Sequence, residues 1–524
     1  MAERTSPTPD QHDDGGGTAA AISGGDGSTS KRVRINDEVT EHEYLDNGSL
    51  KRRKVDTGEK NGASDDDDEE DDEDDDEEVV VPDKVTAETA GDLYLETIDR
   101  KRLDFDFEKL CSVSLSNVNI YACLVCGKYF QGRGKSSYAY FHSVDEDHHV
   151  FINLQTLKVY ILPESYEAKS ATLDDIKYVV NPTFTKSDIA KIDKVPVEAH
   201  DLNFKPYRPG FVGMNNIKQN DYLNVVIQSL AHVGPFRNFF MLENFEGKPE
   251  LVQRVSILIR KLWNPHAFKG HVSPHELLQH VSAISKKRFR ITEQADPFDF
   301  LSWFLNNLHL ALGGSKTRYH SSFIQKIFQG KVRIESQRIT VHADAGDRLR
   351  FEADAQIQAN EMPFMFLSLD LPPAPLFQDD ADKNIIPQIP LQSILSKYDG
   401  VTTHELAGHR KRYKITEAPP FVMFHIKRII KNNLIEEVNH TVVTFNSFAL
   451  DMGPYIEGAT EPILYDLVAN VTHESVEDKH VYSVQVKDKS RDEWLRIQDL
   501  YVESIRREIL FLSESYIQIW ERRR

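Results

Sequence analysis

Residues 213–230 read GMNNIKQNDYLNVVIQSL, a polar loop that runs into a stretch rich in apolar residues. Asp221 stands where that stretch begins. A carboxylate at the start of a helix is stabilised by the free N–H groups and by the helix dipole. The apolar side chains recur at helical spacing, at Tyr222, Val225, Val226 and Leu230. The stretch therefore predicts a loop that delivers position 221 to the N-terminus of a buried helix.

The chain that follows this stretch changes character. Helical patterns come first, at 221–233, 250–264 and 297–312. Strand-like segments come afterwards, at 363–370, 420–427, 464–472, 480–487 and 516–520. Helices followed by strands are typical of the α+β class. We therefore expect residues 210–524 to form one large α+β domain.

The chain before this domain divides into three parts. Residues 1–90 have too few apolar side chains to offset the entropy of ordering, so we predict a disordered acidic tail. From 95 to 194, short alternating segments such as 150–154 predict a small domain of strands and turns. Residues 195–209 contain several prolines and are expected to be a linker.

Composition excludes several classes of protein. The formal charge is −20, but the fourteen consecutive carboxylates of Asp65–Glu78 carry most of it, so there is no global acidic field. No apolar run approaches the ~18 residues that a membrane span needs, and no signal-peptide core is present. Three cysteines are too few for a disulfide framework. We expect a soluble intracellular protein without membrane contact.

The predicted tail carries two basic clusters. One is Lys31–Arg34, and the denser one consists of Lys51, Arg52, Arg53 and Lys54. Short basic segments in an accessible tail are bound by nuclear-import receptors or bind phosphates. The alternative is a solvated cluster that has no binding partner. We predict that the denser cluster is a nuclear-import signal. We interpret the acidic run behind it as a self-repelling spacer.

All three cysteines lie within sixteen residues, and histidines follow shortly after. Cys123 and Cys126 form a CxxC pair whose thiolates can converge on one ion, and His142 and His148 follow. Two sulfur and two nitrogen ligands form the tetrahedral set that Zn²⁺ prefers, and four protein ligands make the site structural. His149 is an alternative to His148, because adjacent strand residues point to opposite faces. A reduced cysteine pair beside surface histidines is the competing interpretation.

These residues carry a first resemblance. The segment Cys111–Leu162, with YFQGRG at 129–134, resembles the UBP-type zinc finger that accompanies ubiquitin-specific proteases. That family commonly has a further Cys at the position of Ser114 and a His at the position of Tyr138. Because both are replaced, the CxxC pair and the spaced histidines should hold the ion, with Cys111 as an alternative ligand. Ubiquitin-tail binding is therefore not carried over.

A second resemblance starts from the opening stretch. Residues 213–230 resemble the nucleophile box of ubiquitin-specific proteases, in which a loop brings a catalytic Cys to a helix N-terminus. Asp221 occupies the position of that Cys, and Gln219 the position of an Asn that helps to hold the oxyanion. Residues 294–301 resemble the glutamine-rich helical box of the same family. The resemblance implies a papain-like domain with palm, thumb and fingers.

The other two triad positions are also altered. The general base should directly precede Tyr482, where Val481 stands, and His480 comes one residue too early. A one-residue offset in a strand should point that imidazole away from the site. Gln498 occupies the third position, next to Asp499, and carries no charge to stabilise an imidazolium.

A single count decides whether the family mechanism is available. Residues 127–524 contain no cysteine, so no register shift restores a cysteine protease. Attack by Asp221 on an isopeptide would form a mixed anhydride while expelling an amine, which is steeply uphill. We therefore predict a catalytically dead protease-like domain in which Asp221 is a helix-terminus residue.

Together, the acidic tail, the finger and the altered box resemble the splicing-associated inactive branch of ubiquitin-specific-protease-like proteins, the snRNP assembly-defective family. The resemblance implies a nuclear scaffold that binds tri-snRNP proteins in pre-mRNA splicing. Alternatives are a receptor for ubiquitin or a ubiquitin-like protein, and an active deubiquitinase. Direct RNA contact through the clusters Lys286–Arg290 and Arg410–Lys414 stays open against solvated surface charge.

Overall fold

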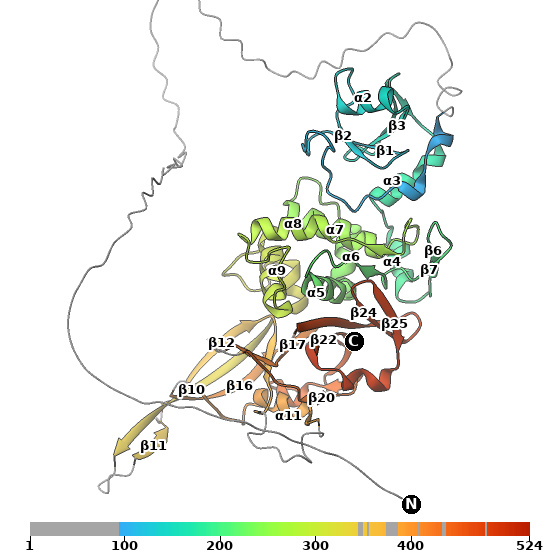
Figure 1. Ribbon diagram of the computed structural model, residues 1–524. Helices are drawn as coiled ribbons and strands as arrows, with labels where there is room; N and C mark the ends of the chain where they lie inside the picture. Colours follow the sequence, from blue (N-terminus) through green and yellow to red (C-terminus); the bar gives the residue numbers. More distant parts are fainter. Residues whose placement is uncertain are drawn as a thin grey trace, which may run out of the picture. The chain divides into compact units, whose positions relative to one another are not determined.

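The computed structural model describes residues 94–343, 349–353, 356–373, 386–406, 408–431, 436–476 and 479–523 (Figure 1). The predicted disordered tail, its acidic run and both of its basic clusters lie outside the described residues. Among the described residues, no helix is long and apolar enough to cross a membrane.

The small domain is built on an antiparallel sheet of five strands in the order β2-β1-β3-β4-β5. The strand predicted at 150–154 is present as β3, one residue shorter than predicted. Helix α2 begins after Ser137, whose hydroxyl accepts a hydrogen bond from the Tyr140 N–H. The elements are η1 (Leu95–Thr97), η2 (Arg100–Arg102), β1 (Ile120–Cys123), β2 (Tyr129–Gln131), α2 (Tyr138–Asp145), β3 (Val150–Asn153), β4 (Val159–Ile161), β5 (Tyr166–Ala168), η3 (Ala171–Leu173) and α3 (Asp174–Val180).

The segment between the two domains differs from the prediction. Helix α4 (Lys186–Ile192) and the hairpin of β6 (Ala199–His200) and β7 (Pro206–Tyr207) occupy it. Ile189, Ala199 and Tyr207 are all buried in the core of the large domain. The residues predicted as a linker at 195–209 therefore form part of the large domain, because they supply apolar side chains to its core.

The large domain begins with helices around α5, which was predicted from the opening stretch. Every residue of α5 is buried, because helices pack on one side of it and the strands β22 and β23 on the other. The three predicted helices are present as α5, α7 and α9. The bounds are β8 (Gly213–Met214), α5 (Asp221–Ala231), α6 (Gly234–Leu242), α7 (Glu250–Leu262), β9 (His271–Val272), α8 (His275–Ile284), α9 (Pro297–Ala311) and α10 (Phe323–Phe328).

The central sheet contains all the strands that the sequence predicted after position 363. Its order is β13-β17-β26-β22-β23-β24-β25, with β21 paired to β22. Apolar residues on one face join the helices in one core, and those on the other face join a second core. The bounds are β13 (Leu367–Asp370), β17 (Phe421–Lys427), β21 (Leu450–Asp451), β22 (Leu464–Val476), β23 (Lys479–Asp488), β24 (Glu493–Gln498), β25 (Tyr501–Ile505) and β26 (Ser515–Arg522).

A second sheet was not predicted. It has the order β11-β10-β16-β15, and β12 also pairs with β10. Its strands are β10 (Gly330–Ala343), β11 (Leu349–Ala353), β12 (Gln358–Phe364), β15 (His404–Leu406) and β16 (His409–Glu417). Short elements complete the described chain: β14 (Gln388–Pro390), α11 (Leu391–Leu395), η5 (Ser396–Tyr398), β18 (Ile429–Lys431), β19 (Glu436–Val438), β20 (Val442–Thr444), η6 (Gly453–Tyr455) and η7 (Arg507–Leu512).

A buried group of charges joins the start of the finger to α7. The Lys261 ammonium donates to the Asp106 carboxylate over 2.8 Å, and Lys269 lies 2.8 Å from the same carboxylate and 2.7 Å from that of Asp104. Burial opposes ionisation of Asp106, but the two lysines outweigh it and hold its pKa well below the usual range. The two lysines compensate the charge of Asp106, which offsets the cost of burying its carboxylate at this contact.

Candidate functional sites

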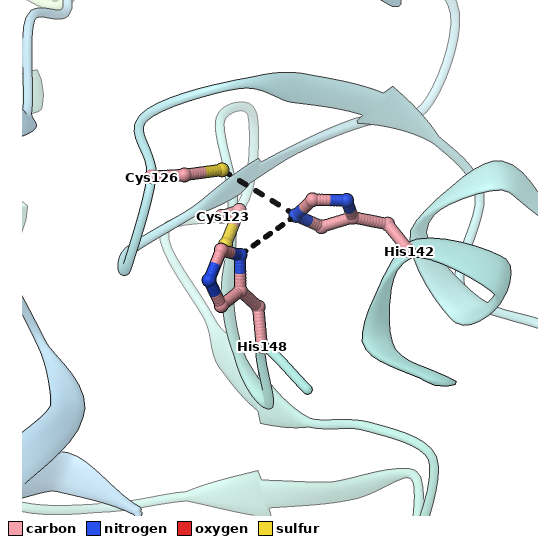
Figure 2. A group of neighbouring side chains, drawn as sticks. All are labelled: Cys123, Cys126, His142 and His148. Carbon is pink, nitrogen blue, oxygen red and sulfur yellow. Dashed lines mark hydrogen bonds between the residues drawn. The ribbon is translucent and has the colours of Figure 1, made fainter. Parts of the chain in front are cut away.

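The metal-ligating residues predicted in the finger come together in the structure (Figure 2). The ligand atoms of Cys123, Cys126, His142 and His148 all lie within 4.8 Å of one another. The His142 Nε2 atom is 3.4 Å from the Cys126 sulfur and 3.0 Å from the His148 Nδ1 atom. Two thiols and two imidazoles converging in this way match the tetrahedral donor set of structural zinc sites.

Local structure explains the convergence. Cys123 ends β1 and Cys126 lies in the turn to β2. Gly127 in that turn has φ +78°, and a Cβ there would collide with the Arg102 carbonyl oxygen, so only glycine fits. His142 projects from α2 and stacks on Phe130, with ring centroids 4.2 Å apart.

The electrostatics of the group favour a thiolate. A hydrogen bond from the Cys123 thiol, together with bonds from the backbone and from His142, outweighs burial and lowers the pKa of Cys126, whereas the same contact and burial raise the pKa of Cys123. The thiolate is the form of cysteine that binds metals. The residues present therefore fit a zinc ion, which all four would hold.

The two alternative ligands are engaged elsewhere. Cys111 is buried, and its sulfur accepts hydrogen bonds from the backbone N–H groups of Val113 and Ser114, at 3.5 and 3.4 Å. The His149 ring donates to the Leu162 carbonyl oxygen over 2.7 Å, and its other nitrogen lies 2.9 Å from the Asp147 carboxylate. Neither side chain belongs to the converging group.

Asp221, which the resemblance predicts to stand at the nucleophile position, is the first residue of α5 and is buried. One carboxylate oxygen accepts hydrogen bonds from the Gln294 amide, at 2.7 Å, and from the Tyr482 backbone N–H, at 3.4 Å. The other accepts from the Tyr222 N–H at 2.9 Å. Burial raises the pKa of Asp221, the charge of Asp499 adds to the rise, and the hydrogen bonds offset part of it.

Gln294 is a functional residue of this region that sequence reasoning missed. Its amide also donates to the His480 carbonyl oxygen over 2.8 Å, and its backbone N–H donates to the side chain of Gln219 over 3.1 Å. Gln294 thus bridges the start of α5 and strand β23. Its place in the glutamine-rich box at 294–301 marks Gln294 in the sequence. The box does not predict which hydrogen-bond partners Gln294 has.

Val481, predicted to stand at the position of the general base, lies on β23. Val481 pairs with Glu474 of β22, whereas His480 and Tyr482 point to the other face, because side chains of a strand alternate. The His480 Nδ1 atom is 2.8 Å from Nε2 of the buried His473. The imidazole of His480 is therefore turned to the imidazole of His473 on the neighbouring strand β22.

Gln498 is the residue predicted for the third triad position, and its side-chain oxygen accepts a hydrogen bond from Arg496 over 3.3 Å. The neighbouring Asp499 has the more central role. Its carboxylate accepts hydrogen bonds from Asn216 and Asn224, each at 2.9 Å, and so fastens the loop before α5 and the helix itself. An Asn inside an apolar helix, as at position 224, is the sequence signal that could have indicated this contact.

In the large domain, the basic clusters Lys286–Arg290 and Arg410–Lys414 differ in how their aromatic residues are placed. In the first, Phe289 is only 1% exposed, which leaves no ring for base stacking. In the second, alternation along β16 puts Lys411 and Tyr413 on the opposite face from Arg410, which pairs with Glu405 at 3.4 Å.

Fold and sites together define the class: a UBP-type zinc finger followed by a ubiquitin-specific-protease fold. The chain belongs to the ubiquitin carboxyl-terminal hydrolase family, whose model matches residues 212–520. The model described as "Zn-finger in ubiquitin-hydrolases and other protein" matches residues 111–173.

Several relatives cover most of the chain. The "Probable mRNA-splicing protein ubp10" of Schizosaccharomyces pombe is 56% identical over 82% of this chain and 88% of its own length. Human "Ubiquitin carboxyl-terminal hydrolase 39" is 47% identical over 82% of this chain and 80% of its own length. The Saccharomyces cerevisiae "Pre-mRNA-splicing factor SAD1" is 31% identical over 84% of this chain and 95% of its own length. A solved structure described as "Crystal structure of an essential yeast splicing factor" matches with TM-score 0.68 and 31% identity, over 82% of this chain and 100% of that one.

Proposed function

We propose that this protein is a non-catalytic scaffold in pre-mRNA splicing that binds proteins of the spliceosomal tri-snRNP in the nucleus. The observation that carries the absence of catalysis is the state of Asp221. It occupies the nucleophile position, residues 127–524 contain no cysteine, and its carboxylate is held by Gln294 and two backbone N–H groups. Relatives of similar length that carry splicing names support the process.

Catalysis is tested with the purified full chain and ubiquitin-7-amido-4-methylcoumarin. We expect no release of the fluorophore above buffer, with an active ubiquitin-specific protease as positive control. Because one relative is named as a hydrolase, the assay separates two real alternatives. Turnover that disappears in Asp221→Ala, but persists after metal removal, would contradict the proposal.

The scaffold role is tested by depletion and add-back. A splicing-competent nuclear extract from which this protein has been removed should lose assembled tri-snRNP on a glycerol gradient. Add-back of the full chain or of Asp221→Ala should restore it equally, because the role needs no chemistry at position 221. Tri-snRNP levels that do not change on depletion would contradict the scaffold role.

We further propose that the finger holds one structural zinc ion through Cys123, Cys126, His142 and His148. When bound, the ion would tie the end of β1, the following turn, helix α2 and the chain before β3 to one centre. We also propose that the cluster Lys51, Arg52, Arg53 and Lys54 directs nuclear import. A fluorescent fusion with all four replaced by Ala should remain in the cytoplasm, and unchanged nuclear accumulation would contradict this role.

A further inference from the structure

Helix α2 of the finger presents apolar side chains to solvent. Tyr138, Phe141 and Val144, which we call the α2 stripe, are 40%, 49% and 57% exposed. They lie three residues apart and therefore share one side of the helix. The opposite side is buried through Ala139, His142 and Ser143. An ordinary surface helix carries charged residues on its outer face, so the α2 stripe is unusual.

The charges beside the stripe lie at the two ends of the helix. Asp145, Glu146 and Asp147 gather at its C-terminal end, and Lys135 precedes its N-terminal end; all four are exposed. This arrangement opposes the helix macrodipole, which favours anions at the N-terminus and cations at the C-terminus. The stability of α2 itself does not account for these charges.

The stripe is held in place from its buried side. His142 stacks on Phe130 and belongs to the converging metal-ligating group, and the hydroxyl of Ser137 caps the helix. A surface whose backbone is fixed in this way loses little conformational entropy when a partner binds.

We propose that the α2 stripe docks an amphipathic helix of a partner protein, which runs antiparallel to α2 and carries basic residues at its N-terminal end and acidic residues at its C-terminal end. In this orientation the basic end meets Asp145, Glu146 and Asp147, and the acidic end meets Lys135. The macrodipoles of the two helices also oppose each other. The proposal rests on the scaffold role for its biological setting and specifies one surface that the scaffold uses.

A second copy of this chain fits the surface less well than a longer helix. Helix α2 has eight residues, which corresponds to a length of about 12 Å. Two such helices would bury far less than the roughly 1,600 Å² of a standard interface. A longer partner helix extends beyond α2 at both ends and gains further contact area.

Two synthetic peptides with the purified full chain test the proposal. Each is an amphipathic helix of about 20 residues with Leu at every third or fourth position, held helical by the same hydrocarbon staple. One has Lys at its N-terminal end and Glu at its C-terminal end, and the other has these charges exchanged. Because composition and helicity are equal, only the direction of charge differs. We expect the Lys-first peptide to bind about tenfold more tightly in fluorescence anisotropy.

Substitutions assign the binding to the stripe. Phe141→Ser should weaken binding about tenfold or more. The matched control is Val401→Ser, at a side chain 76% exposed in the large domain, which should leave binding unchanged. Asp145→Lys combined with Glu146→Lys makes both ends of the stripe basic and should abolish the preference between the peptides. All these side chains are exposed, and zinc content equal to that of the wild type verifies an intact finger.

Three results would overturn the proposal: equal affinity for both peptides, binding that survives Phe141→Ser, or a concentration-dependent dimer that Phe141→Ser abolishes. The last would assign the stripe to self-association. The assay contains no splicing component, so its failure leaves the scaffold role standing, and failure of the extract experiment leaves peptide docking standing.

Discussion

The finger and the region around Asp221 in the large domain arrange their polar side chains in opposite ways. In the finger, the ligand atoms of Cys123, Cys126, His142 and His148 point toward one another within 4.8 Å. In that region of the large domain, each such group is turned to a separate protein partner: Asp221 to Gln294, and His480 to His473. The comparison shows how a candidate binding site differs from a set of similar residues without one. In a binding site the side chains point to a shared centre, whereas around Asp221 each side chain is hydrogen-bonded to a different part of the protein.

The largest effect is expected from breaking the finger. Cys126→Ser should abolish zinc binding and unfold the finger, because the free energy of metal binding contributes directly to the folding of such small domains. The measurements are metal content by mass spectrometry and proteolysis of the finger. Cys111→Ser is the matched control, since Cys111 lies outside the converging group, and it should retain the metal. Loss of zinc in both variants would contradict the assignment.

The contact between the two regions should also be sensitive. Asp106→Ala leaves the buried Lys261 without its carboxylate, and removing one partner of a buried ion pair costs about 3–5 kcal/mol. Urea denaturation measures the free energy of unfolding. Asp174→Ala, which removes an exposed pair with Lys177, is the control and should change it by less than about 1 kcal/mol. Equal effects would show that the buried group is not what joins the domains.

Mild acid should destabilise the large domain through buried histidines. Burial lowers the pKa of His232 to about 4 and that of His425 to about 3. The unfolded chain binds protons near pH 6.5, whereas the folded chain does not, so stability should fall as pH drops from 6.5 toward 4. The slope is about 1.4 kcal/mol per pH unit for each histidine.

Urea denaturation at several pH values between 6.5 and 4 measures this slope. Carboxylates with lowered pKa, such as Asp106, lose their contribution only in stronger acid. Asp221, whose pKa burial raises, acts with the opposite sign, so a histidine substitution is needed to assign the slope. His232→Leu should flatten the slope by about one proton. A slope unaffected by this substitution would contradict the role of His232.

The smallest effect on stability is expected around Asp221. Gln294→Ala removes a bridge between α5 and β23 and should cost about 1–2 kcal/mol, because Asp221 loses its shortest hydrogen bond. Thermal melting measures the change, with Gln219→Ala as control, since Gln219 is exposed and accepts only one bond to the loop. An effect as large as that of Cys126→Ser would remove the difference between the two regions.

Local signals account for what sequence reasoning predicted correctly. The period of apolar residues predicted α5, α7, α9 and the strands of the central sheet, because each has a face buried in a large core. Strand β16 was missed because its mixed charged and apolar residues give no clear alternation. Strand β10 alternates only in two short pieces, at 332–334 and 339–341, with polar residues between them. The segment 195–209 was taken for a linker because prolines suggest a break, yet Tyr207 is buried.

The candidate sites follow the same division. The metal-ligating residues lie within 26 positions, so that spacing alone could select them. The choice between His148 and His149 needed the structure, which turns His149 to Leu162. The contacts of Asp221 and Asp499 join segments more than 70 residues apart, and no local pattern encodes such pairs.

By itself, the sequence determined the kinds of chemistry available: the large domain contains no thiol, and the finger contains closely spaced sulfur and imidazole ligands, because composition and spacing are properties of the chain alone. Only the tertiary structure decided how those groups are used. The fold brings four of these groups together in the finger, places Asp221 in hydrogen-bond contact with Gln294, and leaves the α2 stripe exposed. Packing between distant segments fixes where each of these side chains points.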